Sequence, residues 1–133
     1  MQFQAKRIPA TGSNVIARRG AQMESSLVAC AYIDAKMGSP GAIDNASGVI
    51  VLLLFAEILQ ESSARLGLEI VAFNGEACYA ASGQNGFLAQ NAERWSEIRL
   101  AINLDCAGYL DGASAHTLYA CPEALEQAAQ HTF

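Results

Sequence analysis

The chain has 133 residues, of which 52% are hydrophobic, and it carries a formal net charge of −5. This length suffices for one buried core and is too small for two ordinary domains, so we expect a single domain over 1–133, with 1–11 as an irregular arm. The 8 Lys and Arg residues form no cluster, which argues against a nucleic acid partner because phosphate binding needs a basic patch.

The N-terminus and the longest apolar run predict neither export nor membrane insertion. No apolar segment follows Lys6 and Arg7 at the spacing of a signal peptide, so we expect a cytoplasmic protein. The apolar run 49–56 stops at Glu57 and is less than half of the ~20 residues that a membrane helix needs. We therefore expect a buried helix there and no membrane partner.

The 4 cysteines lie far apart in the chain and include no Cys-x-x-Cys pair. This spacing predicts reduced, buried thiols and argues against a zinc knuckle or a disulfide framework. The residues are Cys30, Cys78, Cys106 and Cys121.

Short apolar runs bounded by glycine and polar residues predict the strands. In chain order these runs lie at 14–17, 27–33, 68–73, 98–104 and 116–120. The first two runs are separated by a polar, glycine-bearing stretch, so we expect both strands to belong to one sheet.

Apolar residues at helical spacing predict a helix over 49–59, capped by Asp44 or Asn45 and covered on most of its sides. A short helix is expected over 80–91, interrupted by glycines, and another over 123–130, opened by Pro122. Strands that alternate with helices predict an α/β fold with three layers, αβα, and a mostly parallel or mixed central sheet.

Carboxylates follow several of the predicted strands. Asp34, Glu76 and Asp105 stand at or just after strand ends, and Asp44 lies on the glycine-flanked turn before the long helix. Because ligands of open α/β sheets collect beyond the carboxyl ends of the strands, we expect these four side chains to converge at one edge. A single such Asp would more often be a cap or a strand end.

The motifs around these carboxylates resemble those of the co-catalytic di-zinc aminopeptidases, metallopeptidase family twenty-eight. This family includes bacterial leucyl aminopeptidases, glutaminyl cyclases and glutamate carboxypeptidases. Its pattern is His-x-Asp, Gly-Ala-x-Asp-Asn-Ala-Ser-Gly, Gly-Glu-Glu, Asn-x-Asp and a distant final His. This chain has Tyr32-Ile33-Asp34, then Gly41-Ala42-Ile43-Asp44-Asn45-Ala46-Ser47-Gly48, then Gly75-Glu76-Ala77 and Asn103-Leu104-Asp105.

The resemblance implies a role for each matching carboxylate. Asp44 takes the position that bridges two zinc ions, and Asp105 the position of a ligand to one of them. Asp34 matches the residue that orients the first histidine ligand. Glu76 matches the general base that takes a proton from metal-bound water. The resemblance also implies a zinc cofactor, a peptide substrate if the protein is active, and a C-terminally short version of the phosphorylase/hydrolase-like fold.

The chain departs from the family at its metal ligands. Tyr32 stands where the first histidine belongs and Ala77 where the second glutamate belongs. His116 and His131 come too early for the final histidine, and we expect neither to be a ligand. Because a catalytic zinc keeps three protein ligands and one open position, we expect zinc to be weakly bound or absent, and the enzyme to be inactive.

Three other interpretations stay open from the sequence. The protein could be an active aminopeptidase completed by a partner subunit, or by an unusual ligand such as Tyr32 or Cys106. It could be a cysteine hydrolase that uses Cys78 or Cys106 with His116, although acidic surroundings raise a thiol pKa. It could also be a non-catalytic binding or assembly module. A sheet shorter than the family's would leave a strand edge uncovered, so we expect a homo-oligomer, a two-fold dimer that uses this edge and the 123–130 helix.

Overall fold

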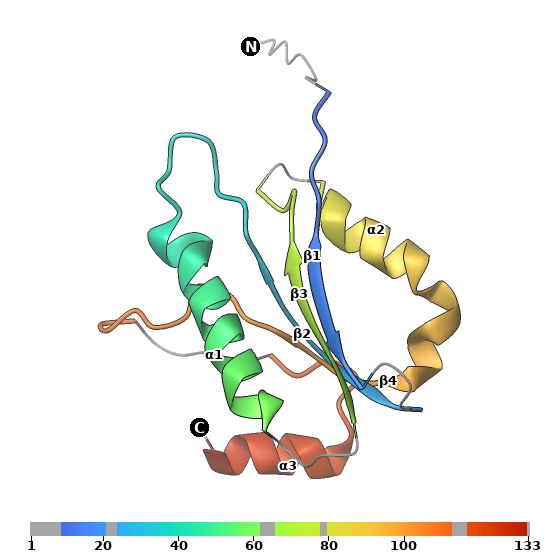
Figure 1. Ribbon diagram of the computed structural model, residues 1–133. Helices are drawn as coiled ribbons and strands as arrows, with labels where there is room; N and C mark the ends of the chain where they lie inside the picture. The colour runs from blue at the N-terminus through green and yellow to red at the C-terminus, as the bar shows by residue number, and fades with distance from the viewer. Residues whose placement is uncertain (1–8, 21–23, 62–65, 78–79, 113–116, 133) are drawn as a thin grey trace, which may run out of the picture.

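The computed structural model describes residues 9–20, 24–61, 66–77, 80–112 and 117–132 (Figure 1). Its strands are β1 (Val15–Arg19), β2 (Ser26–Tyr32), β3 (Gly67–Phe73) and β4 (Ile98–Asn103). Its helices are α1 (Gly48–Gln60), α2 (Ser82–Gln90) and α3 (Glu123–Thr132), with a short η1 turn (Ala42–Ser47) before α1 and a 3-10 helix η2 (Ala92–Glu97) before β4. Of the predicted arm, 9–11 have no regular secondary structure and the rest lies outside the described residues.

The four strands form one mixed sheet in the order β1-β3-β2-β4. Strand β2 runs parallel to β3 and to β4, whereas β1 pairs with β3 in the antiparallel direction. The first two strands thus share a sheet as predicted, but β3 lies between them. Because β2, β3 and β4 are parallel, their carboxyl ends meet at one edge of the sheet. The candidate site residues lie at this edge.

Helix α1 covers one face of the sheet and helix α2 covers the other (Figure 1). Successive side chains of β2 alternate between the two faces, as strand geometry requires. Val28 and Cys30 pack with Phe87 of α2, whereas Ala29 and Ala31 pack with Leu52 of α1. The predicted three-layer α/β architecture is therefore confirmed.

A buried carboxylate on β3 ties the strand to its neighbours. Glu69 is 3% exposed and accepts hydrogen bonds from Arg18 of β1 at 3.0 Å and from Arg94 of η2 at 2.6 Å. Each carboxylate oxygen is thus met by a guanidinium group, which compensates for the cost of burying a charge.

Helix α1 is far more open than its sequence predicts. Gly48 and Leu52 are its buried residues, while Ile50, Leu53 and Ile58 are 58%, 62% and 73% exposed. The expectation of a helix covered on most sides is wrong, because the described chain packs only the sheet-facing side. The stretch Ala42–Gln60 is, by length and composition alone, apolar enough to cross a membrane, although non-helical dihedrals at Asp44 and Asn45 break it.

Three further sequence predictions need correction. The helix expected over 80–91 begins at Ser82 and is not interrupted by its glycines. Gly83 instead lets the first turn approach the end of β3, since a Cβ there would lie 2.3 Å from the Asn74 carbonyl oxygen. Residues 117–120 form no strand, and His116 lies outside the described residues. Of the described cysteines only Cys30 is buried, and all are free.

Candidate functional site

The expected cluster lies at the carboxyl edge of the parallel strands. Tyr32 is the last residue of β2, and Asp105 follows β4 by two residues. Asp44 comes from the η1 turn, which leads from the loop after β2 into helix α1. Three segments far apart in the sequence therefore bring their polar side chains to one place.

Asn45 is the structural centre of this edge. Its side chain is 1% exposed and its Nδ2 donates to the carbonyl oxygens of Leu104 at 3.0 Å and Tyr32 at 3.4 Å. Its Oδ1 accepts from the backbone N–H groups of Cys106 at 3.0 Å and Gly48 at 3.2 Å. One amide thus joins the ends of β2 and β4 to the start of α1. The peptide bond before it, from Asp44, is cis.

Gly48 allows this arrangement because a side chain would not fit there. A Cβ at this position would lie 2.2 Å from Oδ1 of Asn45 and 2.6 Å from the carbonyl oxygen of Leu104. The Asn-x-x-Gly spacing of the turn is therefore a packing requirement. The sequence indicated Asn45 only as a helix cap, and the spacing to Gly48 is the signal that could have revealed more.

Asp34 organises the loop that carries Glu76. Its Oδ1 accepts hydrogen bonds from the backbone N–H groups of Gly75 at 2.9 Å and Glu76 at 3.1 Å, and its Oδ2 accepts from Ala77 at 2.9 Å. A carboxylate that accepts hydrogen bonds from three consecutive backbone N–H groups holds the loop in one conformation. The side chain of Asp34 therefore acts on the loop of the general-base position, and the described contacts do not join it to the Tyr32 ring.

The phenol of Tyr32 contacts both carboxylates of the expected metal position. Its hydroxyl donates to Oδ1 of Asp44 and lies 3.0 Å from Oδ1 of Asp105, a second acceptor. Partial burial and these two hydrogen bonds raise the pKa of Tyr32 above its ordinary value. The phenol is thus held in its neutral form, which is a hydrogen-bond donor and a poor metal ligand.

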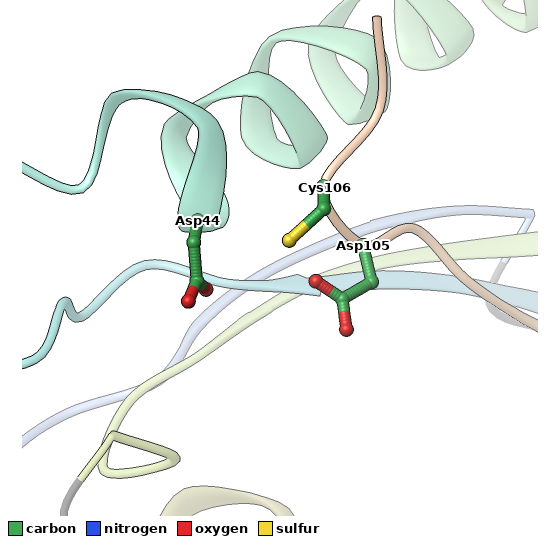
Figure 2. Close-up of side chains that lie close together, drawn as sticks. All are labelled: Asp44, Asp105 and Cys106. Atoms are coloured by element: carbon green, nitrogen blue, oxygen red, sulfur yellow. The ribbon is translucent and has the colours of Figure 1, made fainter. Parts of the chain in front are cut away.

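Cys106 completes a group of three side chains that converge on one point (Figure 2). One ligand atom each from Asp44, Asp105 and Cys106 lies within 4.8 Å of the others, and all three residues are exposed. A hydrogen bond to the Asp105 carboxylate, together with desolvation, raises the pKa of the Cys106 thiol to about 11. Cys106 was expected here only as one of two unusual ligands, beside Tyr32, in the alternative interpretation of an active enzyme, and the structure places its thiol next to both carboxylates.

A cleft of about 320 Å³ opens beside this group, on the face of the sheet that α2 covers. Tyr32, Glu76 and Asp105 line it, and burial raises the pKa of the Cys30 thiol, also in its wall, to about 11. Glu76, expected to be the general base, and Asp105, expected to be a metal ligand, therefore face one cavity. A raised thiol pKa disfavours the thiolate, which argues against a cysteine nucleophile at Cys30 or Cys106; Cys78 lies outside the described residues.

The residues present do not fit a pair of zinc ions. Among the described residues the metal-ligating side chains that meet are two carboxylates and one thiol, and no imidazole joins them. His131 is exposed in the last turn of α3. The Tyr32 hydroxyl contacts Oδ1 of both carboxylates, so one oxygen of each is already engaged. Zinc takes four ligands in a tetrahedral arrangement, and two such shells cannot be built from this set.

Comparison with known proteins gives the same relationship as the motifs. The profile described as Peptidase family M28 matches residues 14–132. An uncharacterized protein of Escherichia coli (strain K12), YfbL, is 29% identical over 127 residues, which cover 86% of this chain and 39% of that protein. The chain thus spans about two fifths of that relative's length. No solved structure gives a significant match.

Proposed function

Because the chain belongs to peptidase family M28, we propose that it is an aminopeptidase-type domain that no longer hydrolyses peptides, a pseudoenzyme with a vestigial metal site. M28 peptidases are in general zinc-dependent, and their chemistry needs a metal that polarises water and the peptide carbonyl.

The contact of Tyr32 with both carboxylates is the observation that carries the proposal. A neutral phenol donates a hydrogen bond to Asp44 and lies within hydrogen-bonding distance of Asp105, whereas a metal ligand must offer a lone pair. Ala77, at the position of the second glutamate, has no donor atom in its side chain. Each of the two metal positions therefore lacks protein ligands that the family supplies.

Glu76 supports the same conclusion from the side of proton transfer. Its side chain is exposed at the cleft, in the position of the family's general base. A general base contributes only when the proton that it removes is within hydrogen-bond reach. Without a firmly held metal-bound water, Glu76 has no activated proton to take, so retention of this residue does not by itself imply activity.

An assay of the purified protein on aminoacyl anilides, with and without added zinc, tests the proposal. We expect no hydrolysis above that of the Glu76→Gln variant at any zinc concentration. Restoring Tyr32→His and Ala77→Glu should raise zinc affinity without full turnover, since the described residues bring no second imidazole to the site. Zinc-dependent hydrolysis that survives repurification and disappears in Glu76→Gln would refute the proposal.

The convergence of Asp44, Asp105 and Cys106 favours a second candidate, an active metallohydrolase whose missing ligands come from an unusual ligand such as Cys106 or from a partner subunit. Three ligands and one open position are what a catalytic zinc site needs. The two candidates differ in metal content. Zinc that stays bound in a 1:1 ratio through dialysis, and activity that rises more than proportionally with protein concentration, would favour the second.

The exposed apolar side of α1 favours a third candidate, a binding or assembly module that associates with itself. Ile50, Leu53 and Ile58 lie on this side, each more than half exposed. Large apolar side chains grouped on one surface often mark an interaction site. Strand β4 also pairs with β2 only, which leaves an edge among the described strands. A homo-oligomer would cover such surfaces.

A further inference from the structure

Two carboxylates from distant segments lie side by side at the edge of the sheet with one hydroxyl between them. Asp44 and Asp105 both have Oδ1 within hydrogen-bonding distance of the Tyr32 hydroxyl. Like charges this close repel, so a site that gathers two carboxylates needs a cation or a hydrogen-bond donor between them. In a metal centre the cation has that role, and here a phenol occupies the place.

We propose that the Tyr32 hydroxyl replaces the cation, joining the η1 turn to the end of β4 and keeping divalent cations out of the site. We call this arrangement, formed by Tyr32, Asp44 and Asp105, the tyrosine bridge. A neutral O–H joins the carboxylates without supplying Lewis acidity. The bridge therefore keeps the shape of the site and removes its chemistry, and Tyr32 is the residue that selects against metal.

The backbone around Tyr32 holds the hydroxyl in place. The N–H of Ile33 donates to the carbonyl oxygen of Phe73 at 2.8 Å, and the N–H of Leu104 donates to that of Cys30 at 2.8 Å. The carbonyl oxygen of Tyr32 itself accepts from the buried Asn45 side chain. The end of β2 is thus hydrogen-bonded to both neighbouring strands. The backbone of Tyr32 is therefore held in place, and the phenol contacts the carboxylates without rearrangement of the end of β2.

Removal of the hydroxyl alone should reveal a cation site. The Tyr32→Phe change keeps the ring and leaves the ligand atoms of Asp44, Asp105 and Cys106, which lie within 4.8 Å of one another. Two oxygens and a sulfur at bond lengths of about 2.0–2.3 Å suit zinc or cobalt with an open fourth position. The variant adds no ligand, so any gain in affinity comes from the loss of the hydroxyl.

The experiment compares Co²⁺ binding to the native protein, Tyr32→Phe and a matched control, Tyr119→Phe, which removes a hydroxyl from a side chain that is 94% exposed. Binding is followed by the visible absorption of Co²⁺ and by the absorption of a Co²⁺–thiolate bond. We expect Tyr32→Phe to bind Co²⁺ at least about tenfold more tightly than the native protein. Changes beside a metal ligand typically shift metal affinity by about 10–100-fold, and here the shift should be a gain because a competing hydrogen-bond donor is removed. The control should match the native protein. In a Tyr32→Phe, Cys106→Ser double variant the thiolate absorption should disappear.

The tyrosine bridge rests on the proposed function in one respect, namely that the native site holds no cation. The experiments distinguish failure of the one from failure of the other. If Tyr32→Phe is folded and binds Co²⁺ no better than the native protein, the tyrosine bridge is refuted, while the inactive assignment stands. Zinc-dependent hydrolysis by the native protein would instead refute the proposed function. If Tyr32→Phe does not fold, NMR spectra of the native protein with added Mn²⁺ test whether a divalent cation enters the site. Selective broadening of the amide signals of Asp44 and Asp105 would overturn the bridge, and its absence is the expected result.

Discussion

Replacement of Asn45 by alanine should destabilise the protein by about 3 kcal/mol. The buried side chain makes four hydrogen bonds to backbone groups of β2, of the segment just after β4 and of the first turn of α1. Alanine leaves the buried Gly48 N–H without its acceptor, at a cost of about 1–3 kcal/mol, and the contacts to Leu104 and Cys106 add about 1 kcal/mol each. Water entering at the exposed rim offsets part of this sum.

Urea unfolding followed by circular dichroism measures the effect. The midpoint should fall with the slope unchanged, which identifies a change in stability and not in the compactness of either state. For a domain of this size the loss corresponds to a fall of about 10 °C in the melting temperature. The Asn45→Asp variant should be at least as unstable at neutral pH, because it places a buried charge against the carbonyl oxygens of Leu104 and Tyr32.

The matched control is Asn85→Ala, which removes one exposed hydrogen bond to the carbonyl oxygen of Ala80. An exposed amide of this kind should contribute less than about 0.5 kcal/mol. If Asn45→Ala loses less than about 1 kcal/mol, Asn45 does not hold the strand ends together, and our account of the edge is refuted.

Three further predictions follow from the described contacts. The pKa of Cys106, raised to about 11, leaves less thiolate at pH 8, so iodoacetamide should modify this exposed thiol roughly 100-fold more slowly than an ordinary cysteine with a pKa of about 8.5. The rate should rise up to about pH 11, and Asp105→Asn should increase it at pH 8 by lowering the thiol pKa. Replacement of Arg94 by alanine should cost about 2 kcal/mol of unfolding free energy, since the buried Glu69 keeps one of its two guanidinium partners. The native protein should be a dimer by light scattering, and Leu53→Glu should make it monomeric without lowering its helix content.

Each of these has a result that would contradict it. Mass spectrometry showing Cys106 alkylated at pH 8 as fast as a free thiol would contradict the assigned hydrogen bond to Asp105. An Arg94→Ala variant as stable as the native protein would show that Arg18 alone satisfies the carboxylate. A monomer mass at concentrations in the tens of micromolar, on the order used to test weak dimers, would count against self-association.

The sequence by itself determined the layered architecture and the position of the site. Alternating and helical periods of apolar residues are local properties of the chain, so they identify β2, β3, β4 and α1 to within a few residues. The motifs around Asp44 and Asp105 gave the family, which the profile match over residues 14–132 confirms. They also identified Tyr32 and Ala77 as departures, because a motif shows what is missing at a given spacing.

Only the tertiary structure decided what the departures do. The contacts of the Tyr32 hydroxyl join residues 12 and 73 positions apart, and those of Asn45 reach 61 positions along the chain. No local period encodes such distances. They exist because parallel strands bring their carboxyl ends to one edge, where glycine at position 48 permits close approach. The open side of α1 is likewise a property of what packs against the helix, since its apolar sequence is the same whether or not anything covers it.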